Sequence, residues 1–222
     1  MNLDTTGHCR YVMVGASAAF TDRIVLRWLT GVANAPQAGE RIRIVLHPCD
    51  SGESIRAVRS GILDLGLIET TGRTPGLRSR LMTRDRLVVV VGPSHQWCRR
   101  ASIDAATLST ASLIVVSSAT ETNRYVERAL RHRGGPRQVP AQAGAEVLTS
   151  TQARAAARAG HAPAVLSLQV VADDLQRGLL RAVPISDVDL TRGLRAVWRP
   201  GNPPPAPLLS TLTAAATLRS PL

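Results

Sequence analysis

RIRIVLHPCDSGESIRAVRSGILDLGLI, residues 41–68, is the stretch that fixes the class of fold. Its first part, Arg41–Leu46, places apolar residues at every second position, which is the period of a strand. Gly52–Ser60 carries apolar residues at helical spacing, and Gly61 stands where it can end that helix. Leu63–Ile68 is a second apolar strand. A strand, a helix and a strand in this order predict two parallel strands joined by a crossover helix.

The segments before and after this stretch extend the same alternation. Tyr11–Val14 predicts a strand, and Asp22–Val32 predicts a helix with apolar residues three and four positions apart. The beginning of the chain is therefore predicted to be a β-α-β-α-β unit with a parallel sheet. Leu87–Val91 is apolar at every position, which is typical of a strand buried on both faces.

The second half of the chain repeats this plan. Its predicted strands are Leu113–Val116, Gln138–Ala141, Pro163–Leu168, Leu179–Val183 and Gly193–Trp198, and its predicted helices are Asn123–His132, Ser150–Ala159, Val170–Gln176 and Leu208–Leu218. Ser60–Ile68 and Ala159–Ser167 echo each other, because both contain the end of a helix, a glycine and then a strand. The fold class is therefore α/β, and we expect two similar lobes with a ligand cleft between them.

Composition and charge narrow the class of protein. Apolar residues make up 44% of the 222, and the net charge is +11, from 27 basic residues, all arginine, against 16 acidic ones. A basic chain invites a nucleic-acid hypothesis. However, the arginines are spread along the chain, and aromatic residues are only 3%, too few for a base-stacking surface. A solvated basic surface is the simpler interpretation.

Neither the N-terminus nor the cysteines indicate export. Residues 1–10 are polar and lack the basic start and apolar run of a signal peptide, so we expect a cytoplasmic protein without a membrane segment. Cys9, Cys49 and Cys98 are odd in number and far apart, which favours reduced thiols over a disulfide framework or a zinc site. We expect no metal and no cofactor.

A series of short motifs occurs in a specific order. They are Gly15-Ala16-Ser17, Asp50-Ser51-Gly52-Glu53, Leu63-Asp64-Leu65-Gly66-Leu67-Ile68, Asp85 to Val91 followed by His95, Thr120-Glu121-Thr122-Asn123, Thr149-Ser150, Ala159-Gly160, Leu166-Ser167, Arg192 and Val197-Trp198. In order and spacing this series resembles the effector-binding domain of LysR-type transcriptional regulators, over about residues 10–218. The chain departs from the family pattern in several places. It has no proline after His95, Asn123 replaces an arginine, and Ala119 and Ala162 replace glycines.

The resemblance implies two Rossmann-like lobes, similar to type-2 periplasmic binding proteins and joined by crossover strands. Lobe I would hold about residues 10–92 and 193–222, and lobe II about 93–192, within a single effector-binding domain over 1–222. The helix-turn-helix of the family is expected to be absent from this chain, so DNA would be a partner only through that other part. The resemblance also implies a homodimer that uses the Asp22–Val32 helix of one subunit and the Asn123–His132 helix of the other.

The expected partner of the domain itself is a small polar or carboxylate metabolite bound in the cleft. The candidate ligand-binding residues lie at the ends of strands or in the segments that follow them, and are Ser17, Ala18, Ile68, Thr120, Thr122, Thr149 and Ser150. Hydroxyl groups and helix N-terminal N–H groups are suited to oxyanions. For the serines and threonines, helix capping is the competing role, and for Ile68 it is core packing.

Other functions need features that the sequence does not supply. A solute-binding protein of a transporter would have nearly the same fold but would be exported. A truncated regulator would act through dimerisation alone. An enzyme would need a catalytic group, and neither His95 nor His161 has a second histidine or a carboxylate at ligand spacing. Ser17, Asp64 and His95 do not form a recognisable triad, and we expect no catalytic residues.

Overall fold

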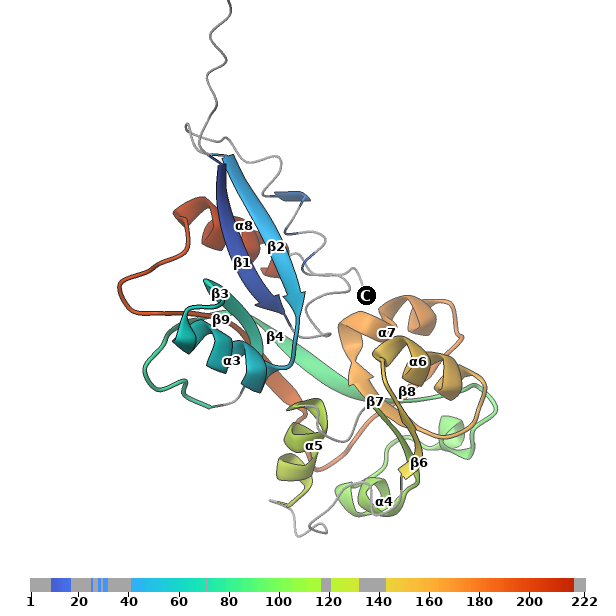
Figure 1. The fold of residues 1–222 in the computed structure, drawn as a ribbon. Helices are drawn as coiled ribbons and strands as arrows, with labels where there is room; N and C mark the ends of the chain where they lie inside the picture. The colour runs from blue at the N-terminus through green and yellow to red at the C-terminus, as the bar shows by residue number, and fades with distance from the viewer. Residues whose placement is uncertain are drawn as a thin grey trace, which may run out of the picture. The chain divides into compact units, whose positions relative to one another are not determined.

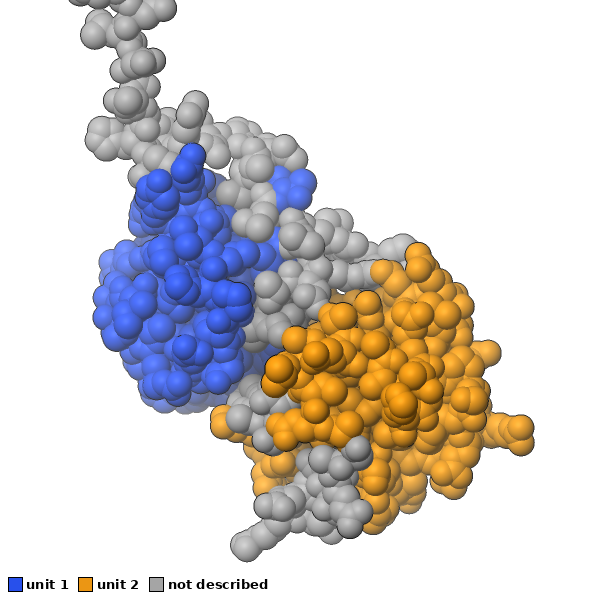
Figure 2. All heavy atoms as spheres, turned by 45° about the vertical axis from the view of Figure 1, so that its right-hand side comes forward, with its two compact units in different colours: residues 1–83, 193–219 blue, residues 84–192, 220–222 orange. Residues whose placement is uncertain are grey.

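The computed structural model describes residues 9–16, 25, 28, 30–31, 41–70, 72–116, 121–131 and 143–217. The chain divides into two compact units (Figure 2). Unit 1 is Met1–Thr83 with Gly193–Arg219, and unit 2 is Arg84–Arg192 with Ser220–Leu222. The chain passes between the units within two strands, β4 (Arg78–Val91) and β9 (Thr191–Trp198), which are hydrogen-bonded neighbours. The first division therefore falls inside a continuous strand, whereas the sequence analysis placed it after residue 92.

Unit 1 contains the predicted β-α-β arrangement. Its sheet has the order β2-β1-β3-β9, with β1 (Cys9–Ala16), β2 (Arg41–Pro48) and β3 (Leu65–Thr70). β1 is parallel to both β2 and β3, which confirms the predicted parallel strands, and β9 is antiparallel to β3. The predicted helix Asp22–Val32 lies largely outside the described residues.

Helix α3 (Ser51–Ser60) connects β2 to β3 (Figure 1). The Asp50 side chain caps its N-terminus by accepting a hydrogen bond from the Glu53 N–H at 2.7 Å. Gly61 ends the helix with φ +84°, a backbone conformation that favours glycine. The glycine stop predicted from the sequence is therefore confirmed.

Two clusters of apolar side chains give unit 2 a core on each side of its sheet. Strand β4 pairs with β7 (Ala164–Ser167) and β8 (Arg181–Val183), and β5 (Leu113–Val116) lies between β7 and β6 (Ala143–Val147). Val89 and Val91 pack in the cluster that contains Trp97, whereas Val90 packs in the cluster that contains Leu166. The run Leu87–Val91 is apolar throughout because its alternate side chains enter two different cores.

The helices of unit 2 follow its strands. They are the 3-10 helix Gln96–Arg99, α4 (Ala105–Thr110), α5 (Glu121–Arg131), α6 (Ser150–Arg158) and α7 (Leu168–Gln176). In unit 1, α8 (Ala206–Thr217) packs on the core beside Trp28. The predicted strand Gln138–Ala141 lies outside the described residues. The sequence analysis did not predict β6, the 3-10 helix Gln96–Arg99, α4 or the part of β4 before Leu87.

Candidate functional site

In unit 1, three parallel strands end at the same edge of the sheet. Ala16, the last residue of β1, is in register with Pro48 of β2 and Leu67 of β3. Ligands of open α/β sheets bind outside such carboxyl ends. Ser17 and Ala18 come directly after Ala16 and lie outside the described residues. Ile68 follows Leu67, but its side chain is fully buried.

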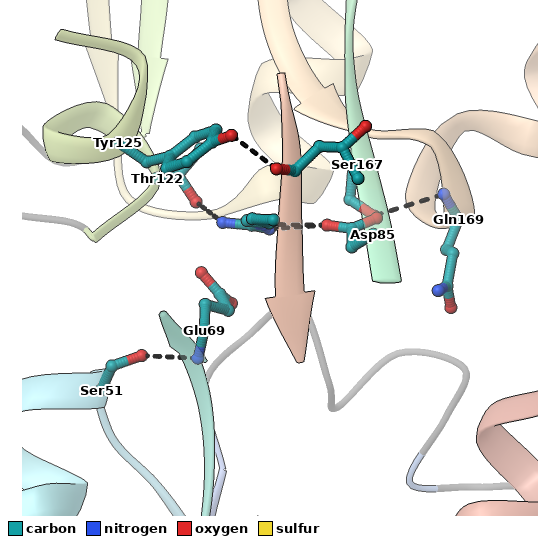
Figure 3. A network of polar contacts seen from close by, with 9 residues as sticks. Ser51, Glu69, Asp85, Thr122, Tyr125, Ser167 and Gln169 are labelled. Carbon is teal, nitrogen blue, oxygen red and sulfur yellow. Dashed lines mark hydrogen bonds and ion pairs between the residues drawn. The ribbon is translucent and has the colours of Figure 1, made fainter. Parts of the chain in front are cut away.

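The start of α3 is tied to the end of β3 at this edge. The Ser51 hydroxyl accepts a hydrogen bond from the Glu69 N–H at 3.0 Å, and both residues are buried (Figure 3). Ser51 stands in a motif noted in the sequence, yet it was not among the candidate residues. Its position, in the first turn of a helix after a parallel strand, was the signal that would have identified it.

In unit 2, the strands β6, β5 and β7 repeat this arrangement. They run parallel, with Val116 in register with Val147 and Ile114 with Ala164. Their carboxyl ends therefore meet at one edge, where α6, α5 and α7 begin. Of the predicted residues, Thr122, Thr149 and Ser150 follow these ends, and Thr120 lies outside the described residues.

A buried ion pair lies next to this edge. The Arg192 Nε and Nη2 atoms both lie 2.9 Å from Asp85 Oδ2, and the two side chains are 3% and 1% exposed. The other carboxylate oxygen of Asp85 accepts a hydrogen bond from Ser167 Oγ at 2.7 Å. Arg192 Nη1 also donates to Thr122 Oγ1 at 2.8 Å (Figure 3). The network thus joins the starts of α5 and α7 to β4 and β9.

Helix α5 has two further attachments near its N-terminus. The Tyr125 hydroxyl donates to the Thr191 carbonyl oxygen at 2.6 Å, and Asn123 Nδ2 donates to the Val116 carbonyl oxygen at 3.2 Å. Burial raises the pKa of the Tyr125 phenol, and the Asp189 carboxylate raises it further. The phenol therefore stays protonated at neutral pH and keeps donating to the backbone. No pattern in the sequence indicated that Asp85, Arg192 and Tyr125 would lie near Thr122.

Thr149 has the geometry of a helix cap. Its hydroxyl accepts from the Gln152 N–H at 3.2 Å, while Gln152 Oε1 accepts from the Thr149 N–H at 3.1 Å. This reciprocal pair is a capping box at the start of α6. Ser150 is half-buried at the first position of the helix.

The substitution Thr149→Ala should lower the free energy of unfolding by about 1 kcal/mol, because the N–H of Gln152 loses its acceptor. Urea denaturation of the purified chain measures this loss. Thr149→Ser keeps the hydroxyl and is the matched control. Equal stability of the alanine and serine variants would contradict the capping role.

Two side chains considered in the sequence analysis, His95 and Cys49, have pKa values that their surroundings shift. His95 Nδ1 accepts from the Trp97 N–H at 3.1 Å and caps the 3-10 helix, and burial lowers the pKa of His95. Burial raises the pKa of the Cys49 thiol, and the Glu53 carboxylate raises it further, so the thiol stays neutral and weakly nucleophilic at pH 7.

Within the described ranges, no three histidine, cysteine or acidic side chains lie close enough together to hold a metal ion. Nor does any described helix have the length and apolarity that a membrane crossing requires.

Comparison with known proteins gives consistent matches. The model of the LysR substrate binding domain family matches residues 6–217. An uncharacterized HTH-type transcriptional regulator of Mycobacterium tuberculosis is 35% identical over 222 residues, which cover 99% of this chain and 71% of that protein.

Solved structures show the same fold at low sequence identity. The regulatory domain of Synechocystis CcmR, in complex with 2-PG, superposes with a TM-score of 0.78 at 15% identity, covering 94% of this chain and 98% of that one. The reduced regulatory domain of Pseudomonas aeruginosa OxyR has a TM-score of 0.74 at 19% identity, covering 96% and 99%. The expected α/β fold, with two lobes like those of periplasmic binding proteins, is confirmed.

Proposed function

The chain belongs to the LysR substrate-binding domain family, the effector-sensing part of LysR-type transcriptional regulators, and we propose that it binds a small polar or carboxylate metabolite. One observation carries the proposal. In each unit, three parallel strands end at one edge, and helix N-termini and hydroxyl-bearing residues follow these ends. Such edges supply N–H donors and a partial positive charge to a polar ligand.

The proposed contacts are the candidate residues at these edges. Ser17 and Ala18 follow β1, Thr120 precedes α5 and Ser150 begins α6, whereas the hydroxyl of Thr149 is assigned to the capping box of α6. Thr122 is assigned an indirect role, because its hydroxyl already accepts from Arg192. Ile68 is assigned a packing role beside the ligand, because its side chain is buried. The regulatory domain of CcmR, which has the same fold, is in complex with the small molecule 2-PG, and this supports a small-molecule effector.

Binding would act on the regulator by shifting the populations of its lobe or dimer arrangements. A ligand changes an equilibrium only as far as it prefers one state over the other. Helix α5 is held to β5 and β9 by Asn123 and Tyr125, so a ligand beside its N-terminus acts on a helix fixed to strands of the sheet. For the whole regulator, we propose a cytoplasmic homodimer whose DNA contacts come from a helix-turn-helix part.

A thermal-shift screen against small carboxylates, amino acids, sulfate and phosphate tests the proposal. A ligand at one hundred times its dissociation constant should add about 2.7 kcal/mol of apparent stability. Ser17→Ala and Thr120→Ala should remove that gain. Thr110→Ala, which deletes an exposed hydroxyl of α4, should retain it. A gain from a carboxylate that is not an amino acid, or from sulfate or phosphate, would refute the assigned residues if it survived both site substitutions, and no gain with any compound would contradict metabolite binding.

A further inference from the structure

A loop in unit 2 bulges away from the edge of β4. Val89 is in register with Val183 of β8, and the Leu87 N–H donates to the Leu190 carbonyl oxygen at 3.0 Å. Residues 184–189 therefore stand opposite Val88 alone. The loop therefore leaves the edge of β4 after Val183 and returns to it at Leu190.

Hydrogen bonds hold this loop in place. The Ile103 N–H donates to the Pro184 carbonyl oxygen and the Ser186 N–H to the Ile103 carbonyl oxygen, both at 2.9 Å. Asp187 Oδ1 accepts from the Ala105 N–H at 2.9 Å. Since its backbone is fixed to Ile103 and the Asp187 side chain to the first residue of α4, the loop forms a preformed wall.

The space between the loop and α7 is a cavity of about 670 Å³. Unit 2 alone lines it, and α7 and β8 both belong to that unit. The apolar part of the lining includes Val88, Leu168, Leu175, Ala182 and Pro184. Small-molecule sites commonly have volumes of about 300–1,000 Å³ and a largely apolar lining. None of the candidate effector residues lines this cavity.

Charged groups of both signs complete the lining: Arg86, Asp187 and Asp189. Arg86 is exposed and has no hydrogen bond or ion pair within the part of the chain that the structure describes. Asp189 Oδ1 accepts from the Thr191 N–H at 3.0 Å and from its hydroxyl at 2.6 Å. The Oδ2 atoms of both aspartates have no hydrogen-bond partner among the described residues. A purely anionic ligand would be repelled by the two carboxylates, and a purely cationic ligand would be repelled by the guanidinium. A zwitterion can pair one charged group with each sign of the lining.

We propose that this cavity is a second ligand site, for an α-amino acid with an apolar side chain. Arg86 binds the α-carboxylate, the free oxygens of Asp187 and Asp189 accept from the α-ammonium, and the aliphatic residues enclose the side chain. The site is separate from the effector site proposed above and does not depend on it.

Calorimetric titration of the full chain with L-leucine, L-methionine and L-phenylalanine tests this site. Two analogues of leucine each remove one charge: 4-methylpentanoate lacks the ammonium, and 3-methylbutylamine lacks the carboxylate. We expect each analogue to bind at least about tenfold more weakly than leucine, because one group of the lining is left unpaired. An analogue that binds as tightly as leucine would overturn the zwitterion assignment.

Substitutions locate the binding within the molecule. Ala182→Trp fills the cavity from an exposed position of β8, and Arg86→Gln removes the cation. Each should weaken leucine binding by about tenfold or more. Ala155→Trp on an exposed face of α6 and Arg181→Gln on β8 are the matched controls and should leave it unchanged. Unaltered binding in Ala182→Trp, or no binding of any of the three amino acids to the wild type at millimolar concentration, would refute the site.

Discussion

Replacing Arg192 by methionine should lower the free energy of unfolding by about 3–5 kcal/mol. The substitution leaves the Asp85 carboxylate almost completely buried, with Ser167 as its remaining described partner on Oδ1. An unpaired buried charge is among the costliest defects in a folded protein. Urea denaturation, followed by circular dichroism, measures the loss.

A double-mutant cycle separates the pairing from the packing of the two side chains. Asp85→Asn alone should also be strongly destabilising, but the double variant should cost less than the sum, because no unpaired charge remains. Arg195→Met is the matched control on the same strand, since Arg195 is only half-buried and bonds an exposed Ser79 hydroxyl. It should cost no more than about 1 kcal/mol. Equal losses for Arg192→Met and Arg195→Met would show that the buried pair carries no special stability.

Replacing Trp28 by alanine should cost about 3–5 kcal/mol, because it leaves a large cavity in the core of unit 1. The Trp28 side chain is fully buried, and its Nε1 donates to the Leu208 carbonyl oxygen at 3.0 Å. It packs in the cluster that contains Val14 and Leu212. Thermal and urea unfolding of the variant should both shift to milder conditions.

Trp28→Phe distinguishes the volume of this side chain from its hydrogen bond. Leu208 keeps a partner in this variant, because the Thr211 hydroxyl donates to the same carbonyl oxygen at 3.1 Å. The cost should therefore be smaller, about 1–2 kcal/mol. Trp198→Ala removes a partly buried tryptophan that packs against the same cluster, and should cost less than Trp28→Ala. A loss for Trp28→Phe as large as that for Trp28→Ala would indicate that the hydrogen bond dominates.

Local patterns predicted most of the regular elements. The alternation in Arg41–Leu46 corresponds to β2. Helix α3 begins after the Asp50 cap and ends at Gly61. Elements with weak local signals were missed. The part of β4 before Leu87 carries arginines at Arg78, Arg80, Arg84 and Arg86, and these exposed polar residues conceal the period of a strand. Helix α4 is only six residues long and rich in serine and threonine, which are weak helix formers, so it shows no helical period in the sequence. The Asp104 side chain caps its start.

The candidate site was predictable to a smaller extent. The sequence indicated that loops after parallel strands would carry it, and Thr122 and Thr149 do follow such strands. It did not indicate what their hydroxyls bond: Thr149 forms a capping box, and Thr122 accepts from Arg192. A threonine before a helix has the same local sequence whether it caps the helix or binds a ligand, so only its actual partners decide between the two roles.

The sequence by itself determined the α/β class and the order of most strands and helices, because each depends on residues close together in the chain. It indicated the family through the order and spacing of short motifs. The tertiary structure decided which polar groups meet. Asp85 lies 107 positions from Arg192 and 82 from Ser167, and the three join only because the pairing of β4, β7 and β9 brings them together. Periodicity and capping record local conformation, whereas the register between distant strands depends on the packing of the whole unit.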